Sequence, residues 1–148
     1  MRISSKGRYG LASMVYMAEM FDKGECITIL SISDKLGLSK IYLEQVFALL
    51  KRAGLVTSVK GAQGGYKISA EPAKITVLQV LRAAESSLFE KTEVSVNAEN
   101  DSIEKAMQSK VFEAMEQSME ELLGKITLQD LVIEAEKHND GKALMFYI

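Results

Sequence analysis

The sequence predicts a mainly α-helical protein with one small β-hairpin. Apolar residues recur at helical spacing along most of the 148 residues, and two short β-like runs flank a glycine-rich stretch. The hydrophobic share of 47% is enough to bury a core, and the single cysteine excludes an internal disulfide. No apolar run is long enough to span a bilayer, and the charged first ten residues do not resemble a signal peptide. We therefore expect a cytoplasmic protein without a membrane partner.

Two helices are expected in the first 40 residues. Residues 6–22 have an amphipathic pattern, and a short second helix begins at Ile29 or Ser31 and ends at Gly37. The apolar face of the first helix is expected to comprise Leu11, Met14, Val15, Ala18 and Phe21.

A third helix and a hairpin follow. Ser39 is a suitable N-cap for a helix over residues 40–54, which Gly54 ends. The runs 55–59 and 66–69 favour β-strands, and the glycine-rich segment between them favours a turn. Two helices, a tight glycine turn, a further helix and a hairpin are the order of a winged helix-turn-helix. The inward face of the third helix is expected to comprise Leu43, Val46, Phe47 and Leu50.

The second half of the chain is predicted to be helical with one loop. Thr76 is a candidate cap for a helix over residues 76–86, and the mixed signals of residues 86–100 predict a loop. Residues 101–124 form the longest helical pattern, and residues 127–138 add one or two further turns.

The long helix is expected to be a dimerisation element. Its apolar face is too wide for the small DNA-binding part of the chain to cover. We therefore expect the same helix of a second copy to pack against it. The alternative is a helix that packs wholly against its own domain. The expected interface residues are Ile103, Met107, Val111, Ala114, Met115, Met119 and Leu122.

The charge is distributed unevenly along the chain. Residues 1–74 hold eleven Lys/Arg and six Asp/Glu, a balance of +5, whereas residues 75–148 hold seven and fourteen, a balance of −7. This asymmetry indicates that only the first half meets a polyanion.

The first turn of the third helix has side chains suited to reading DNA. In a helix-turn-helix this end of the second helix reaches base edges in the major groove. Lys40 suits guanine, Gln45 suits adenine, and Glu44 suits the cytosine amino group. Ser39 and Tyr42 are candidates for phosphate contacts. A solvated helix face is the plainer interpretation of these polar residues.

The stretch "SVKGAQGGYKIS" does not match a nucleotide pocket. A phosphate-binding P-loop needs Gly-Lys-Ser/Thr at the start of a helix, whereas Gly65 here leads into a β-like run. Gly61, Gly64 and Gly65 fit the tip of a hairpin, and Lys60 beside them is expected to approach DNA. Before the first helix or in its first turns, Arg2, Lys6 and Arg8 are expected to contact phosphates.

Four motifs carry a family resemblance. "ISSKGRYGL", "SKIYLEQ", "KRAGLVTSVKGAQGGY" and "ITVLQVLRAAE" together resemble the winged-helix repressor family of the iron–sulfur cluster regulator IscR and the cysteine-metabolism repressor CymR. The ending "ALMFYI" is similar to the cysteine-metabolism, cluster-free subgroup. The resemblance implies a homodimeric transcriptional repressor bound to pseudo-palindromic double-stranded DNA, with cysteine synthase as a possible corepressor. It also implies a DNA-binding domain over residues 1–84, followed by a linker loop, dimerisation helix and C-terminal segment over residues 85–148.

The resemblance also assigns individual residues. Glu44 and Gln45 match the family's base-reading positions, with Tyr42 beside them. Lys60 stands where the cluster regulator has an arginine that enters the minor groove, and lysine lacks the planar fork of arginine. Cluster-binding members carry three cysteines before the long helix, whereas residues 86–105 here have none, so we expect no cluster and no other cofactor.

Cys26 and His138 are single residues of their kinds. Cys26 is either a small buried apolar residue or a redox-sensing thiol. In the second case the chain would be a redox-sensing regulator of another set of genes. A single histidine cannot form a metal site, and His138 in its acidic setting is expected to be solvated.

Two other functional classes are less consistent with the sequence. The adjacent Glu120 and Glu121 diverge on a helix and cannot bracket a reacting atom, so we expect no enzymatic activity. A pure protein-interaction module would explain the acidic half of the chain but not the basic half.

Overall fold

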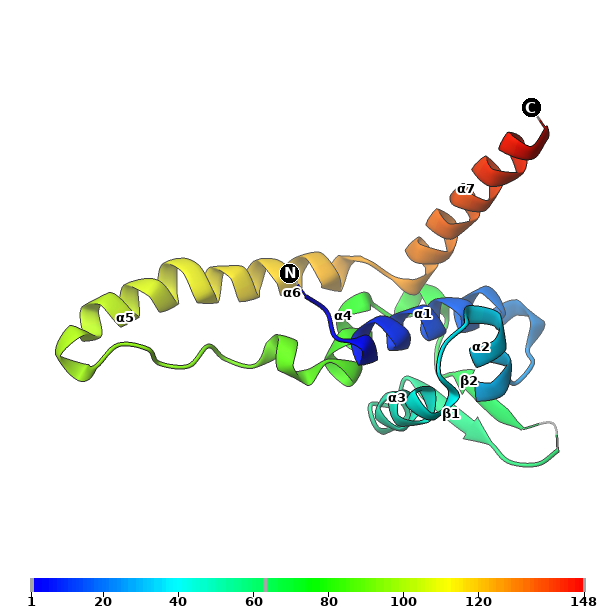
Figure 1. The fold of residues 1–148 in the computed structure, drawn as a ribbon, viewed down its shortest axis with the longest axis horizontal. Coiled ribbons are helices and arrows are strands. Elements are labelled where there is room, and N and C mark those ends of the chain that lie inside the picture. Colours follow the sequence, from blue (N-terminus) through cyan, green and yellow to red (C-terminus); the bar gives the residue numbers. More distant parts are fainter. Residues whose placement is uncertain (1, 63, 148) are drawn as a thin grey trace.

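The structure is a computed structural model that describes residues 2–147 except residue 63, without the side chains of residues 142–147. Figure 1 shows a head of short helices and a hairpin, from which a long helix extends to one side. The mainly α-helical class with a small hairpin is confirmed. The elements are α1 (Ser5–Glu19), α2 (Ile29–Leu36), α3 (Lys40–Arg52), β1 (Val56–Val59), β2 (Gly65–Ile68), α4 (Val77–Ala84), α5 (Asp101–Met107), α6 (Glu113–Lys125) and α7 (Leu128–Tyr147).

The core of the head lies among α1, α3 and α4. The ring of Phe47 is fully buried and packs against Tyr66 of β2, with ring centroids 4.8 Å apart. The prediction that Phe21 belongs to the apolar face of the first helix was wrong: α1 ends at Glu19, and Phe21 lies in a 3₁₀ turn that follows, where it is 38% exposed and lines an apolar cavity. The predicted inward face of α3 is confirmed, since four of its side chains are fully buried, namely Leu43, Val46, Phe47 and Leu50.

Side-chain caps set where the helices of the head begin. The Thr28 hydroxyl accepts from the Ser31 amide at 3.0 Å, so α2 begins at Ile29. The Ser39 hydroxyl caps α3 as the sequence predicts. Thr76 and Gln79 form a reciprocal capping box at the start of α4, which confirms the expected cap.

The hairpin is joined to the head by a third extended segment. β1 and β2 pair antiparallel, with Val56 opposite Ile68 and Val59 opposite Gly65. The backbone of Ile27 then pairs with Tyr66, through N–H···O distances of 2.9 and 2.8 Å. This bridge fixes the start of β2, near the tip of the hairpin, against the segment that precedes α2.

A buried carboxylate ties the start of α1 to the end of α4. Glu85 is 6% exposed and accepts from the Ser4 amide at 2.7 Å and the Ser87 hydroxyl at 3.0 Å. A Cβ atom at Gly7 would lie 2.7 Å from a Glu85 carboxylate oxygen, so only glycine fits there without a shift. Hydrogen bonds from Ser4 and then Ser87 outweigh burial and hold the pKa of Glu85 below its ordinary value.

The long helix runs from residue 101 to residue 125 and contains a π-helical segment. α5 passes into the π-helical residues Gln108–Phe112 and then into α6, where the sequence predicts one uninterrupted α-helix. Residues 86–100 form a loop with short 3₁₀ turns, as expected. The loop leads outward from the head, and the long helix runs back alongside it (Figure 1). The buried Glu104 carboxylate accepts from the Ser95 and Val96 amides at 3.3 and 3.1 Å, which fixes the loop to α5.

α7 is longer than the sequence predicts. The expectation of one or two turns over residues 127–138 was wrong, because the helix continues to Tyr147. Thr127 and Asp130 cap its start reciprocally, at 2.9 and 3.1 Å. Leu128 and Val132 lie in the core of the head. The side chains of the "ALMFYI" ending lie outside the described part of the chain.

Among the described residues, no helix combines the length and the apolarity that crossing a bilayer needs.

We predict that Glu85 gives the head an acid-sensitive stability. Because its pKa is lower in the folded state, its stabilising effect is complete above the ordinary glutamate pKa and is lost as the pH falls through the folded value. The free energy of unfolding of the wild type should therefore exceed that of Glu85→Gln near pH 7, and the gap should narrow on acidification. Ser87→Ala, which removes one donor, should act in the same direction but less. A gap that stays constant down to a pH of about 3.5 would contradict this role.

Candidate nucleic-acid interface

A tight turn places α3 across the head. Gly37 has φ +67°, a left-handed conformation that glycine adopts readily, and it ends α2. The Ser33 hydroxyl donates to the Leu38 carbonyl within the turn. Ser39 then accepts from the Tyr42 amide at 3.4 Å, so that α3 begins at Lys40. The helix-turn-helix therefore forms where the sequence predicts it.

One face of α3 is exposed along its first two turns. Glu44 and Gln45 are exposed, as is Lys40 in the first turn, so the expected base-reading side chains are accessible. Ile41 lies on the same face, because residues three and four apart are neighbours on a helix, and it is 73% exposed. Ile41 is not among the residues predicted from the sequence to meet DNA, although the helical spacing 41, 44, 45, 48 would have placed it on this face.

Tyr42 and Ser39, the two residues expected to contact phosphates, both have partners within the protein. Tyr42 is half-buried and packs edge-on against Tyr9 of α1, with ring centroids 5.3 Å apart. The Ser39 oxygen accepts from the backbone, which leaves its hydroxyl proton able to donate to a phosphate oxygen. The tyrosine pair places the second turn of α1 beside the first turn of α3.

The hairpin tip has the backbone geometry expected of the glycines. Gly61 has φ +115° and Gly65 has φ +151°, and a Cβ atom at Gly65 would lie 2.6 Å from the Ile27 carbonyl oxygen. A Cβ atom at Gly64 would lie 2.2 Å from the Val59 carbonyl oxygen, so the backbone crosses too closely for a side chain. Lys60 is exposed beside this tip. Gln63 lies outside the described residues.

Two of the N-terminal basic residues lie around a polar hollow of about 410 Å³. Arg2 and Arg8 are exposed and line it, together with the buried Glu85. The Arg8 guanidinium donates to the Ser5 hydroxyl at 3.1 Å. Lys6 is half-buried and does not line the hollow.

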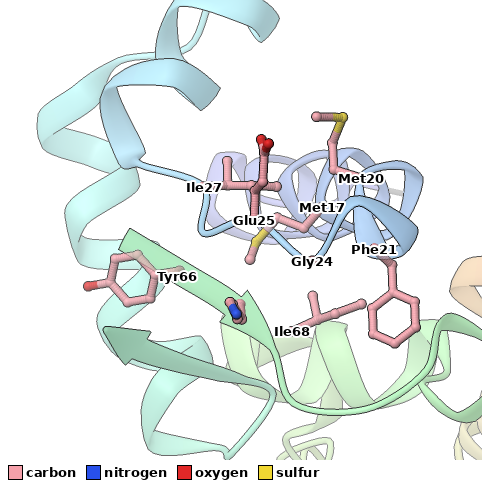
Figure 2. Close-up of a pocket in the computed structure, with 9 residues that line it drawn as sticks. Met17, Met20, Phe21, Gly24, Glu25, Ile27, Tyr66 and Ile68 are labelled. Atoms are coloured by element: carbon pink, nitrogen blue, oxygen red, sulfur yellow. The ribbon is translucent and has the colours of Figure 1, made fainter. Parts of the chain in front are cut away.

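A small apolar cavity lies behind the hairpin (Figure 2). Its volume is about 270 Å³, and its walls come from the end of α1, the turn after it and β2. Glu25 and Ile27, the two neighbours of Cys26, both line it, and the free Cys26 is half-buried. A change at Cys26 would thus fall next to the Ile27–Tyr66 bridge that holds the hairpin.

The expected dimerisation residues are largely uncovered in the single chain. Ile103, Met115 and Leu122 are 52%, 65% and 61% exposed, and Val111 is 45% exposed. Ala114 is also exposed, whereas Met107 and Met119 are half-buried. α6 packs against α4 through its other side, where Arg82 and Glu120 form an ion pair at 2.7 Å.

The donor atoms near the long helix do not fit a metal cluster. The loop 86–100 has no cysteine, and Cys26 follows α1 in a different part of the chain. Within the described residues, no three side chains of His, Cys, Asp or Glu come together as metal ligands. His138 is exposed and lies 3.4 Å from Glu134 of the same helix. The loop is fixed instead by the carboxylate of Glu104.

A helix-turn-helix with an exposed polar recognition face and an adjoining hairpin defines a winged-helix DNA-binding regulator. The chain belongs to the Rrf2 family, described as "Iron-dependent Transcriptional regulator", whose model matches residues 3–134. The predicted winged helix-turn-helix class and the predicted family are thereby confirmed. Because members of this family are transcriptional regulators, the expectation that the chain is not an enzyme is confirmed as well.

Relatives and solved structures cover nearly the whole chain. The transcriptional regulator CymR of Bacillus subtilis is 35% identical over 150 residues, which cover 100% of both chains. Its structure, described as that of a global cysteine regulator, has a TM-score of 0.74 over 90% of this chain and 98% of that one. IscR of T. potens is 38% identical, with a TM-score of 0.73 over 93% and 90%. An oxidized form of Staphylococcus aureus CymR is 33% identical, with a TM-score of 0.68 over 89% and 96%.

Proposed function

We propose that the chain is a homodimeric repressor that binds a pseudo-palindromic site in double-stranded DNA. The exposed face of α3 beside a glycine-tipped hairpin is the observation that carries the proposal. In the proposed complex each α3 enters a major groove, and each hairpin reaches a flanking minor groove. Phosphates next to these grooves are contacted by Arg2, Lys6 and Arg8, because the Tyr9–Tyr42 pair holds the start of α1 next to α3.

The base-reading residues follow from exposure and chemistry. Gln45 offers an amide that can bond adenine at two atoms, and Glu44 accepts from the cytosine amino group. Lys40 donates to guanine or to a phosphate. Lys60 at the hairpin donates to the DNA backbone. Gly61, Gly64 and Gly65 form the tight tip beside it, since Gly61 has a positive φ and the other two lie too close to the protein's own backbone for a side chain.

The dimer would form through the long helix. Its exposed apolar residues lie away from the side that packs on α4, so a second copy can cover them without moving the head. The division into a DNA-binding domain over residues 1–84 and a dimerisation segment over residues 85–148 belongs to this proposal. The two parts are in contact, because Leu128 and Val132 at the start of α7 lie in the core of the head.

The regulated genes are proposed by likeness to CymR. Similarity over the whole chain to a protein described as a global cysteine regulator supports control of cysteine and sulfur metabolism genes. Such a regulator would act in the cytoplasm. Cysteine synthase would then act as a protein corepressor. Genome-wide mapping of bound sites tests the proposal, because the genes beside those sites identify the pathway. Sites without sulfur-metabolism genes would overturn the assignment but not the DNA binding.

A thiol switch at Cys26 is the second candidate function. The position of Cys26 between two residues that line the cavity beside the hairpin favours it, and a relative has been crystallised in an oxidized form. With one thiol per chain, oxidation would end at a sulfenic acid, a mixed disulfide or a bridge between two chains.

We predict different effects for the two kinds of DNA contact. Gln45→Ala should relax sequence preference at one position per half-site and cost about 1–3 kcal/mol there, because alanine cannot form the two hydrogen bonds to adenine. Lys60→Ala should weaken binding to all duplexes and reduce the log–log salt slope by about 0.9 for each phosphate that the lysine neutralises. Fluorescence anisotropy over a salt series measures both, with Lys137→Ala on α7 as a charge-matched control. A chain that binds no duplex at low salt would refute the regulator proposal.

We predict that Met115→Glu separates dimerisation from folding. The side chain is 65% exposed in the single chain, so the substitution should leave the head folded but place charge in the apolar interface. Sedimentation should report a monomer with unchanged helical content and weakened operator binding. Gln117→Glu, which adds the same charge on another face of α6, should remain dimeric. A dimeric Met115→Glu protein would place the interface elsewhere.

We predict that Cys26→Ser distinguishes a sensing thiol from a structural one. If the thiol senses oxidants, peroxide should lower the operator affinity of the wild type and leave Cys26→Ser unaffected, because serine cannot form a sulfenic acid. Titration of operator binding with and without peroxide measures this difference. If peroxide releases both proteins equally, Cys26 is structural.

A further inference from the structure

Ile41 is an apolar side chain near the start of α3 that faces DNA in the proposed complex. It is 73% exposed, more than any other large apolar side chain described in the head. The residues that follow it on the same face are Glu44 and Gln45, which are polar and exposed. An isoleucine here therefore interrupts a face whose other exposed side chains, Glu44 and Gln45, carry hydrogen-bonding groups.

The exposure of Ile41 follows from the register of α3. The four buried side chains of this helix lie on its opposite face and anchor it to the core. Ile41 is the second residue after the Ser39 cap, so it stands in the first turn of the helix. Side chains in this turn are the ones that approach base edges when such a helix enters the major groove. The core does not need Ile41, and the head gains little packing from it.

The chemistry of the side chain restricts what it can contact on DNA. Isoleucine has no hydrogen-bonding group, so it cannot bond a phosphate or the polar edge of a base. In the major groove, the apolar group that a base pair presents is the C5-methyl of thymine. Burying one methyl against another removes apolar surface from water, which favours that base over one without the methyl group.

We propose that Ile41 is a specificity-determining residue that reads the C5-methyl group of a thymine in each half-site. This inference rests on the proposed DNA binding and adds recognition of a methyl group, which Glu44 and Gln45 cannot detect by hydrogen bonding. Two chains in a dimer would select two symmetry-related thymines.

The structure offers a matched control on the neighbouring helix. Leu30 of α2 is also apolar and is 55% exposed, but it lies outside α3. If exposed apolar side chains here served a protein partner or merely stabilised the fold, Leu30→Ala and Ile41→Ala would change the response to the thymine methyl group to a similar extent. If Ile41 reads a base, only Ile41→Ala changes the response to the thymine methyl group.

The test replaces thymine by deoxyuridine, which removes only the methyl group. Operators are first selected from random duplexes with the purified full-length protein, and each thymine of a half-site is then replaced in turn. For the wild type, replacing the contacted thymine in one of the two half-sites should lower affinity about fourfold, the value for one buried methyl-sized group. Ile41→Ala should distinguish the thymine and deoxyuridine duplexes less than the wild type, because its single methyl group buries less apolar surface, whereas Leu30→Ala should retain the wild-type difference. All three proteins should have the same melting temperature and the same oligomeric state.

The outcomes separate this inference from the proposed function. A protein that selects no operator refutes the DNA-binding proposal itself. A protein that selects an operator but tolerates deoxyuridine at every position, or selects half-sites without a fixed thymine, refutes only the role of Ile41. An Ile41→Ala protein that keeps the wild-type sensitivity to deoxyuridine also refutes it, since another residue would then contact the methyl group.

Discussion

The structure depends on a long helix whose apolar face the chain does not cover. Met115, Leu122 and Ile103 are each more than half exposed, while the other side of the helix packs on α4. Exposed apolar patches of this kind mark interaction surfaces in soluble proteins. Because α4 belongs to the head, a partner on this helix would fix two heads relative to each other. The spacing of two recognition helices then becomes a property of the interface rather than of either head.

Within one head, buried polar anchors position the surfaces that are proposed to meet DNA. Glu85 ties the start of α1 to the end of α4 through the Ser4 amide, and Gly7 leaves room for its carboxylate. The Tyr9–Tyr42 pair then places α1 against the start of α3. The Ile27–Tyr66 bridge holds the hairpin. These contacts join segments that are distant in sequence. A substitution that breaks one of them would therefore alter the position of the recognition helix or of the hairpin.

The sequence predicts the head well because local signals agree there. Ser39, Thr76 and Gly37 cap or end helices through neighbours three to five residues away, and helical periodicity identifies the buried face of α3. Prediction fails at helix ends without a local stop signal and where long-range contacts decide. Phe21 lies outside the first helix because α1 ends early, and α7 extends beyond its apolar pattern. The Glu85–Ser4 hydrogen bond spans 81 positions, which no periodicity signals. Ile41 escapes a search for polar base-reading chemistry because it is an apolar residue on a polar face.

The proposed mechanism requires a dimer that presents two α3 helices to one DNA site. Hydroxyl-radical footprinting of the full-length protein on a selected operator shows whether it does. We expect two protected segments related by two-fold symmetry, with their centres separated by about 10–10.5 base pairs or a multiple of that spacing. A single protected segment without a symmetric counterpart would contradict the mechanism.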